Sequence, residues 1–208
     1  EETQFSPDQL KEDSHRIHLD LPQSSGCVVE LVLREGELLQ ELAKDVDCYK
    51  YDLAIIGSPK KKRAAHGLIQ FLNTSVFVVK NFNIDHQYAF QLCVDDSKTT
   101  KRAVVFAVKV AKHFNSRIKL VTVSKTNFFK PGYRNAHRWA ERYLKRMGVD
   151  YDSVLISGDP VKVFISEADN DHIIIMGKAK GNEILKFVLG SKPIHTAQQA
   201  NCPVLLVN

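Results

Sequence analysis

The sequence predicts an α/β fold with an open sheet of mostly parallel strands. Short apolar runs rich in β-branched residues alternate with segments whose apolar residues have helical spacing. The order strand–helix–strand indicates parallel strands joined by crossover helices. This order occurs twice along the 208 residues, and a hydrophobic content of 44% is enough for a real core. An α/β fold with two related halves is therefore expected.

The stretch from His172 to Ser191, HIIIMGKAKGNEILKFVLGS, carries the main functional signal. Its apolar start predicts a short buried strand that ends at Gly177. Gly190-Ser191 precedes a predicted helix over 192–200 that has Pro193 in its first turn. A strand, a glycine-containing loop and a helix N-terminus together suit a phosphate, because unpaired backbone N–H groups point toward the anion.

The two halves are predicted element by element from the same apolar periodicity. In the first half we expect strands at 27–33, 52–57 and 75–80 and a helix at 37–46. In the second half we expect strands at 89–94, 118–123, 154–157, 173–176 and 203–207. The helices of that half are expected at 98–114, 133–147, from Asp159-Pro160 through 168, and at 192–200.

The halves repeat each other in sequence. The series VELVLREGELLQEL, DLAIIGS and SVFVVKN parallels DSVLISGDPVKVFI, HIIIMGK and CPVLLVN. The first copy has no clear counterpart of residues 89–123, and no Gly-Ser opens its final helix. We therefore predict a partial repeat without a nucleotide loop over 1–82, and a complete domain with the site over 83–208.

With these motifs in place, residues 87–208 resemble a universal stress protein domain. The family pattern has an Asp soon after the first strand, here Asp95, and Gly-x-x-Gly, nine residues and Gly-Ser before the last helix. Gly177 and Gly190-Ser191 fit this spacing without a gap. Lys180 stands where the second glycine belongs, and Gly181 is displaced by one.

The resemblance implies a flavodoxin-like open parallel sheet, with tandem universal-stress-protein-like domains. It also implies ATP as the ligand, with or without Mg²⁺. The adenine is expected near Cys93, Asp95 and Val123, and the ribose and phosphates along the glycine loop. The full set of candidate binding residues is Cys93, Asp95, Ser97, Val123, Met176, Gly177, Lys180, Gly190 and Ser191.

Each candidate has an alternative interpretation. Asp95 is either an adenine acceptor or a carboxylate that stabilises the start of the following helix, and Asp95-Asp96 is a weaker candidate for Mg²⁺. Lys178 and Lys180 either neutralise phosphate or belong to a solvated loop in which Lys180 obstructs the pocket. Ser191 either donates to phosphate or is a plain N-cap.

The excess of basic over acidic residues is 29 − 24 = 5, which suits an anionic small ligand without requiring nucleic acid. The basic stretch 59–63, PKKKR, resembles a nuclear import signal and is also a candidate contact for nucleic acid, but a solvated loop is the expected interpretation. The basic helix over 134–146 is either a docking surface for an acidic protein partner or an ordinary exposed face. The family usually pairs domains through the last strand. Residues 75–80 and 203–207 are therefore expected to pair as a pseudo-dimer of repeats, or chains to pair as a homodimer.

Four scattered cysteines without a CxxC pair indicate free thiols in a reducing compartment, so a cytoplasmic location is expected. No apolar run reaches the ~20 residues needed to span a membrane. No nucleophile–base pair or HExxH-type metal set is present, so we expect a regulatory adenine-nucleotide-binding module and no enzyme, slow incidental ATP hydrolysis aside. The alternative is a degenerate scaffold that binds no nucleotide and serves as an interaction domain.

Overall fold

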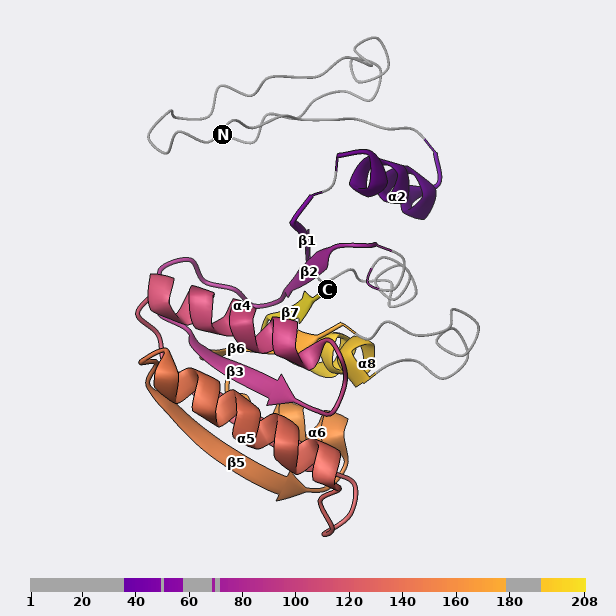
Figure 1. Ribbon diagram of the computed structural model, residues 1–208. Coiled ribbons are helices and arrows are strands. Elements are labelled where there is room, and N and C mark those ends of the chain that lie inside the picture. The colour runs from indigo at the N-terminus through magenta and orange to yellow at the C-terminus, as the bar shows by residue number, and fades with distance from the viewer. Residues whose placement is uncertain (1–35, 50, 58–68, 70–71, 179–191) are drawn as a thin grey trace.

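The computed structural model of the chain describes residues 36–49, 51–57, 69, 72–178 and 192–208. In this part of the chain one seven-stranded sheet carries helices on both faces (Figure 1). The predicted strand at 27–33 and the basic stretch at 59–63 lie outside the described residues.

The second half contains five strands and four described helices, as the periodicity predicted. Their order and bounds are β3 (Ala89–Val94), α4 (Thr100–His113), β4 (Ile118–Ser124), α5 (Pro131–Arg146), β5 (Tyr151–Ser157), α6 (Pro160–Ser166), β6 (His172–Gly177), α8 (Lys192–Gln199) and β7 (Val204–Val207). The first half contributes α2 (Leu38–Tyr49), β1 (Leu53–Gly57) and β2 (Ser75–Val79).

The strand order is β1-β2-β7-β6-β3-β4-β5, and every neighbouring pair is parallel except β2 and β7. β2 and β7 run antiparallel, with Val76 opposite Leu206 and Phe77 opposite Leu205. The predicted pairing of 75–80 with 203–207 within one chain is therefore confirmed. Through this pair the two halves share one continuous sheet.

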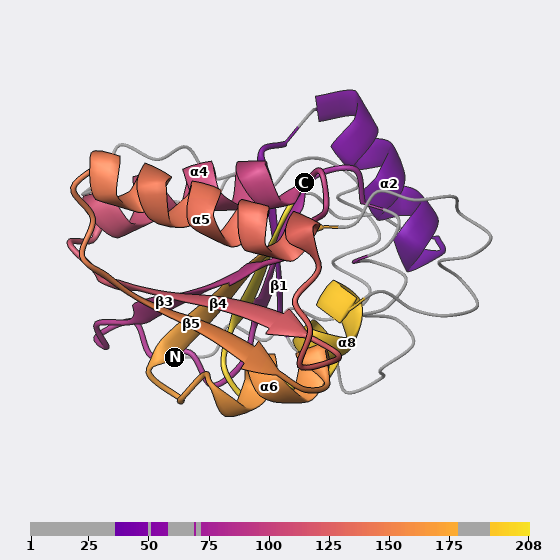
Figure 2. The same ribbon diagram turned by 60° about the horizontal axis from the view of Figure 1, so that its bottom comes forward.

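Helices α4 and α5 lie on one face of the sheet, and α6 and α8 lie on the other (Figure 2). Small residues on α4, Ala103, Ala107 and Ala111, are fully or almost fully buried, so the helix backbone packs closely on the sheet. The opposite core includes Ile194 and Ala197 of α8. Alternate residues of each central strand face the two cores, which is why these strands are predominantly apolar.

Two element boundaries differ from the prediction for identifiable reasons. α4 begins at Thr100, after an N-cap at Thr99, because the Asp95 side chain holds the preceding residues in a turn. β5 begins at Tyr151 and pairs with β4 over its whole length, whereas the sequence predicted only its last four residues. Its polar start is tolerated because β5 is an edge strand with exposed positions.

Candidate functional site

The strand order reverses between β3 and β6. The chain runs from β3 outward through β4 to β5 and then crosses back to β6 on the other side of β3. Open α/β sheets bind ligands outside the carboxyl ends of the strands at such a switch point. Cys93 lies directly beside Met176 there, and Asp95 and Gly177 follow at the ends of the same two strands. The fold thus brings together candidates that are more than 80 positions apart in the sequence.

Asp95 is held by the first turn that leads into α4. Its Oδ1 accepts hydrogen bonds from the Ser97 backbone N–H at 3.0 Å and from the Thr100 hydroxyl at 2.7 Å. Within the described part of the chain, its Oδ2 accepts no hydrogen bond. The carboxylate therefore performs the structural role that was the alternative reading, and one oxygen remains for a ligand donor.

Hydroxyl groups surround this carboxylate. The Ser97 Oγ lies 3.1 Å from Thr99 Oγ1 and 3.3 Å from Thr100 Oγ1. Both threonines are buried, whereas Ser97 is partly exposed. Ser97 is thus the member of this cluster that a molecule outside the strand ends can reach.

Three of the candidates are apolar and buried. Cys93, Val123 and Met176 are each at most 5% exposed and belong to the core between the sheet and α8. Burial raises the pKa of the Cys93 thiol far above its usual range, so it stays protonated and unreactive at neutral pH. These side chains form an apolar floor under the switch point.

Gly177 has a packing role that the sequence did not reveal. A Cβ added there would lie 2.5 Å from the Thr99 Oγ1 and 2.8 Å from the Thr99 carbonyl carbon. Only a residue without a side chain allows the start of α4 to lie so close to the end of β6. This close approach brings Asp95 and Gly177 to the same edge.

Lys178 does not fit either role predicted for it. It is 8% exposed, and its ammonium donates hydrogen bonds to the backbone carbonyls of Leu72 and Thr74, just before β2. Its backbone N–H donates to the Val207 carbonyl at 2.6 Å. The side chain therefore ties the end of β6 to the first half of the chain, and is neither a solvated loop residue nor directed to a phosphate. Lys180, Gly190 and Ser191 lie outside the described residues.

Gln91 is a buried polar residue that the sequence analysis overlooked. It is fully buried on β3, and its Nε2 donates to the Phe164 carbonyl near the end of α6 at 2.7 Å. Its Oε1 has no partner among the described residues. The one polar residue in an otherwise apolar strand, AFQLCV, was the available signal, because buried polar groups need partners.

The predicted basic helix corresponds to α5. Arg134, Arg138 and Arg142 are exposed at four-residue spacing along it. Its only acidic residue, Glu141, pairs with the buried His137, with 3.4 Å between Glu141 Oε1 and His137 Nε2. The expected exposure of these three arginines is therefore confirmed, whereas a protein partner that docks on them stays a prediction.

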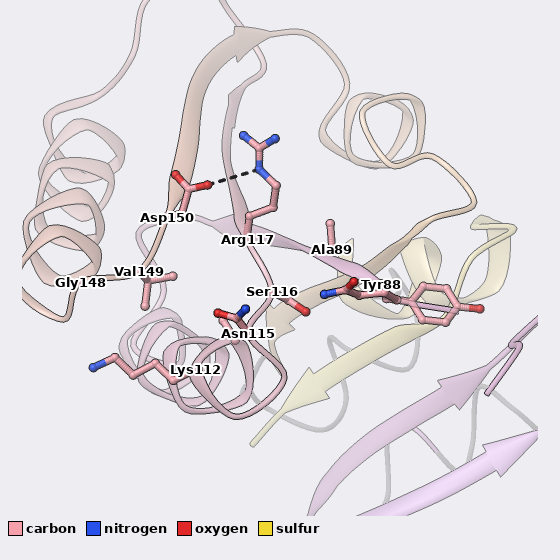
Figure 3. A pocket seen from close by; sticks show the side chains of 11 residues that line it. Tyr88, Ala89, Lys112, Asn115, Ser116, Arg117, Gly148, Val149 and Asp150 are labelled. Carbon is pink, nitrogen blue, oxygen red and sulfur yellow. Dashed lines mark ion pairs between the residues drawn. The ribbon is translucent and has the colours of Figure 1, made fainter. Parts of the chain in front are cut away.

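One cavity lined by described residues lies at the opposite, amino edge of the sheet. It measures about 640 Å³ and is lined by residues that include Tyr88, Lys112, Ser116 and Arg117 (Figure 3). Arg117 pairs there with Asp152 at 2.5 Å and with Asp150 at 3.8 Å. Because ligands of open α/β sheets bind at the carboxyl ends of the strands, this cavity is not the predicted site.

Across the described ranges, no group of three or more His, Cys, Asp or Glu side chains could hold a metal ion. In the same ranges, no helix has both the length and the apolar character that crossing a membrane requires.

Comparisons with known proteins agree on one family. The pattern of the Universal stress protein family matches residues 91–208. A universal stress protein from Archaeoglobus fulgidus DSM 4304 has a similar structure, with a TM-score of 0.70 and 20% identity over 85% of this chain and 68% of that chain. A putative universal stress protein from Pseudomonas aeruginosa UCBPP-PA14 gives a TM-score of 0.61 and 13% identity over 83% and 69% of the two chains.

A third structure is a universal stress protein in complex with cAMP. It has a TM-score of 0.50 and 23% identity, and it covers 58% of this chain and 97% of its own. No curated protein sequence matches the chain. At these identities the solved structures establish the fold, and the sequence pattern establishes the family.

Proposed function

Because the chain belongs to the Universal stress protein family, we propose that it binds an adenine nucleotide at the carboxyl ends of β3 and β6. The observation that carries the proposal is the meeting of Asp95 and Gly177 above the Cys93–Met176 pair at the switch point. The spacing from Gly177 to Gly190-Ser191 adds the phosphate-binding motif of the family.

The chemistry of these residues suits an adenosine moiety. The Asp95 Oδ2 would accept a hydrogen bond from the exocyclic amino group of adenine. The strand ends with Cys93, Val123 and Met176 beneath them give the base an apolar surface. Backbone N–H groups near Ser191 would receive the phosphates at the start of α8. A relative crystallised with cAMP supports this class of ligand.

ATP is the nucleotide we propose, held by the candidate residues named from the sequence, with Lys180 beside the phosphates. The role is regulatory binding without turnover. Specific hydrolysis requires a positioned water and base. The buried Cys93 thiol is protonated, and in this proposal the remaining oxygen of Asp95 accepts from the adenine, so neither residue is assigned as that base.

Thermal unfolding with ATP, ADP, AMP and cAMP, each with and without Mg²⁺, tests the proposal. A ligand that binds only the native state stabilises it by about 2.7 kcal/mol at 100 times Kd. For a chain of this size the stabilisation corresponds to a rise in Tm of about 5–10 °C. Asp95→Asn, which keeps an acceptor for Ser97 and Thr100, should reduce the rise. The matched control, measured without Mg²⁺, is Asp96→Asn at the exposed neighbouring carboxylate, which should keep it.

The second candidate function is a scaffold that binds no nucleotide. The anchoring of Lys178 to the carbonyls before β2 favours it, because this contact directs the first residue after Gly177 toward the other half. A scaffold predicts no Tm shift with any nucleotide at millimolar concentration. It also predicts loss of a protein partner on charge reversal at Arg134 and Arg138.

A further inference from the structure

Helices α4 and α5 are strongly basic on the side that faces away from the sheet (Figure 2). Nine exposed basic residues lie there, and we term them the basic layer. The members on α4 are Lys101, Arg102, Lys109 and Lys112. The members on α5 are Arg134, Arg138, Arg142, Lys145 and Arg146.

Positive charge is concentrated in this layer. Glu141 is the one acidic residue in the two helices, so their net charge is 9 − 1 = +8. The whole chain has a net charge of only +5, so the rest of it is net acidic. Glu141 already pairs with His137 and accepts a hydrogen bond from the Ser153 hydroxyl at 2.6 Å. Within the part of the chain that the structure describes, no member of the basic layer forms an ion pair.

The stability of the helices does not account for this arrangement. The arginines of α5 follow one another at four-residue intervals, and like charges at this spacing repel along a helix. Lys101 and Arg102 lie in the first turn of α4, where the helix dipole favours anions. The dipole favours the basic residues in the last turn of each helix, but not the others. The charge therefore points to an external anion.

A protein partner fits the basic layer less well than an anionic surface does. The core of a protein–protein interface is apolar and depleted of charged residues. The large apolar side chains that are exposed in the described residues all lie outside α4 and α5. Charges also cover the aromatic rings of α5. The Lys101 Nζ lies 5.7 Å from the centroid of the Trp139 ring, and the Arg146 guanidinium lies 5.7 Å from that of Tyr143.

The basic layer extends in two dimensions. α4 and α5 have 14 and 16 residues, so they are about 21 and 24 Å long. Packed helices lie about 8–10 Å apart, and both of these helices carry basic residues from the first turn to the last. A lipid leaflet presents its anionic headgroups over a plane, whereas a nucleic acid presents its phosphates along its strands. The shape of the layer thus favours a membrane surface.

We propose that the basic layer binds the surface of a membrane that contains anionic phospholipids. Its arginine side chains would each donate two parallel hydrogen bonds to a headgroup phosphate, and its lysines would bind as point charges. Trp139 and Tyr143, which are partly exposed, would lie at the level of the headgroups, where these residue types are common in membrane proteins. This binding is separate from the proposed nucleotide site at the strand ends.

Co-sedimentation of the 208-residue chain with lipid vesicles, without nucleotide, tests the proposal. One set of vesicles is pure phosphatidylcholine, and the other contains about 30 mol% phosphatidylglycerol as the anionic lipid. At about 0.1 M salt we expect at least tenfold tighter binding to the anionic vesicles, because each Lys or Arg near such a surface contributes about fivefold. The difference should disappear at about 1 M salt, where charges are screened within about 3 Å.

Variants on each helix locate the binding surface. Lys109→Gln on α4 and Arg138→Gln on α5 should each weaken binding to the anionic vesicles about fivefold. The matched control is Lys162→Gln, which removes an exposed lysine from α6 on the opposite face of the sheet and should leave binding unchanged. All three changes are at exposed positions, so Tm should stay within about 2 °C.

Three results would overturn the proposal. The first is equal binding to neutral and anionic vesicles at low salt, and the second is an equal loss for Lys109→Gln and Lys162→Gln. The third is tighter binding to a DNA duplex or to polyglutamate than to the anionic vesicles, at the same concentration of negative charge. It would assign the basic layer to nucleic acid or to an acidic protein. Because no measurement includes nucleotide, failure here is distinct from failure of the nucleotide-binding proposal.

Discussion

The two halves of this molecule use the same strand pattern in different surroundings. β1 and β6 both end in glycine after an apolar run, and both neighbour the antiparallel joint between β2 and β7. Around β6 the chain supplies β3, α4 and the glycine-loop motif, whereas among the described residues β1 pairs only with β2, and its Leu53 and Ile55 are exposed. The comparison shows that a local apolar pattern is sufficient to form a strand. Whether the strand is buried, and whether a binding site can form at its end, depends on the strands and helices that pack beside it.

The joint between the halves consists of more than one strand pair. The Lys80 ammonium donates to the carbonyls of Gln198 and Ala200, each at 2.9 Å, across from the first half to the end of α8. Lys178 reaches in the opposite direction, to the carbonyls before β2. Two lysines thus cross the joint in opposite directions and tie the first half of the chain to the second.

The largest difference between the halves should be seen at Ile55 and Ile175, which stand two residues before Gly57 and Gly177 at equivalent places in their strands. Ile175→Ala removes a fully buried side chain and should lower the free energy of unfolding by about 2–5 kcal/mol. Ile55→Ala in the 208-residue chain should change it by less than about 0.5 kcal/mol, because the side chain is exposed. Urea unfolding of both variants measures the difference, and equal losses would show that β1 is covered.

The two strand-end glycines offer the next contrast. Gly177→Ala should destabilise the protein by about 1–3 kcal/mol, because the new methyl group would collide with the Thr99 backbone. At Gly57 the added methyl group of Gly57→Ala would have no atom of the described residues within 4 Å, so this change should be neutral or slightly stabilising. Chemical denaturation again provides the measurement. A harmless Gly177→Ala would refute the close packing of α4 on β6.

The joint is tested by Lys178→Met. Removal of the ammonium leaves the Leu72 and Thr74 carbonyls without this donor and should cost about 1–2 kcal/mol. Hydrogen exchange should then accelerate at β2 more than at β4, because the contact holds the segment before β2. Lys109→Met on the exposed side of α4 is the control. If β2 and β4 respond equally, Lys178 is not a link between the halves.

The smallest effect should be a pH dependence of the free energy of unfolding that arises from His137 in the second half. Burial lowers the pKa of His137, whose ring contacts Thr122 Oγ1 at 2.9 Å and Glu141 at 3.4 Å. A folded-state pKa below the unfolded value of about 6.5 means that the unfolded state takes up the proton first. The contribution of His137 to the free energy of unfolding is therefore fully present above about pH 6.5. It is lost as the pH falls below that value, by at most about 1.4 kcal/mol per pH unit.

His137→Gln isolates this contribution from that of the carboxylates. The variant should show a shallower fall in the free energy of unfolding between pH 7 and pH 5 than the parent protein. His113→Gln, at an exposed position near the end of α4, should keep the parent slope. Parallel slopes for the parent and His137→Gln would contradict the effect of burial on the pKa of His137.

Much of the fold could be predicted from the sequence, because apolar periodicity reports directly on strands and helices. The repeat of DLAIIG and HIIIMG indicated the two halves, and the family resemblance indicated the β2–β7 pairing. The start of β5 was not predictable from apolar content, because Asp152 and Ser153 are exposed on an edge strand. Its extent depends on pairing with β4, which no local window contains.

The candidate site was predictable in position but not in detail. The motif spacing indicated Asp95 and Gly177, and the strand order brings them to one edge. The contact between Gly177 and Thr99 joins residues 78 positions apart, and the Lys178 contact joins residues more than 100 apart. Such contacts depend on three-dimensional packing, so periodicity and motif spacing do not reveal them.

The most direct test of the central claim is the stoichiometry of nucleotide binding by calorimetric titration of the chain with ATP. Since only the second half retains the motif, we expect one nucleotide per chain, and we expect Gly190→Val to abolish binding. Two nucleotides per chain, binding that survives Gly190→Val, or no binding at millimolar ATP would each contradict a nucleotide site confined to the second half.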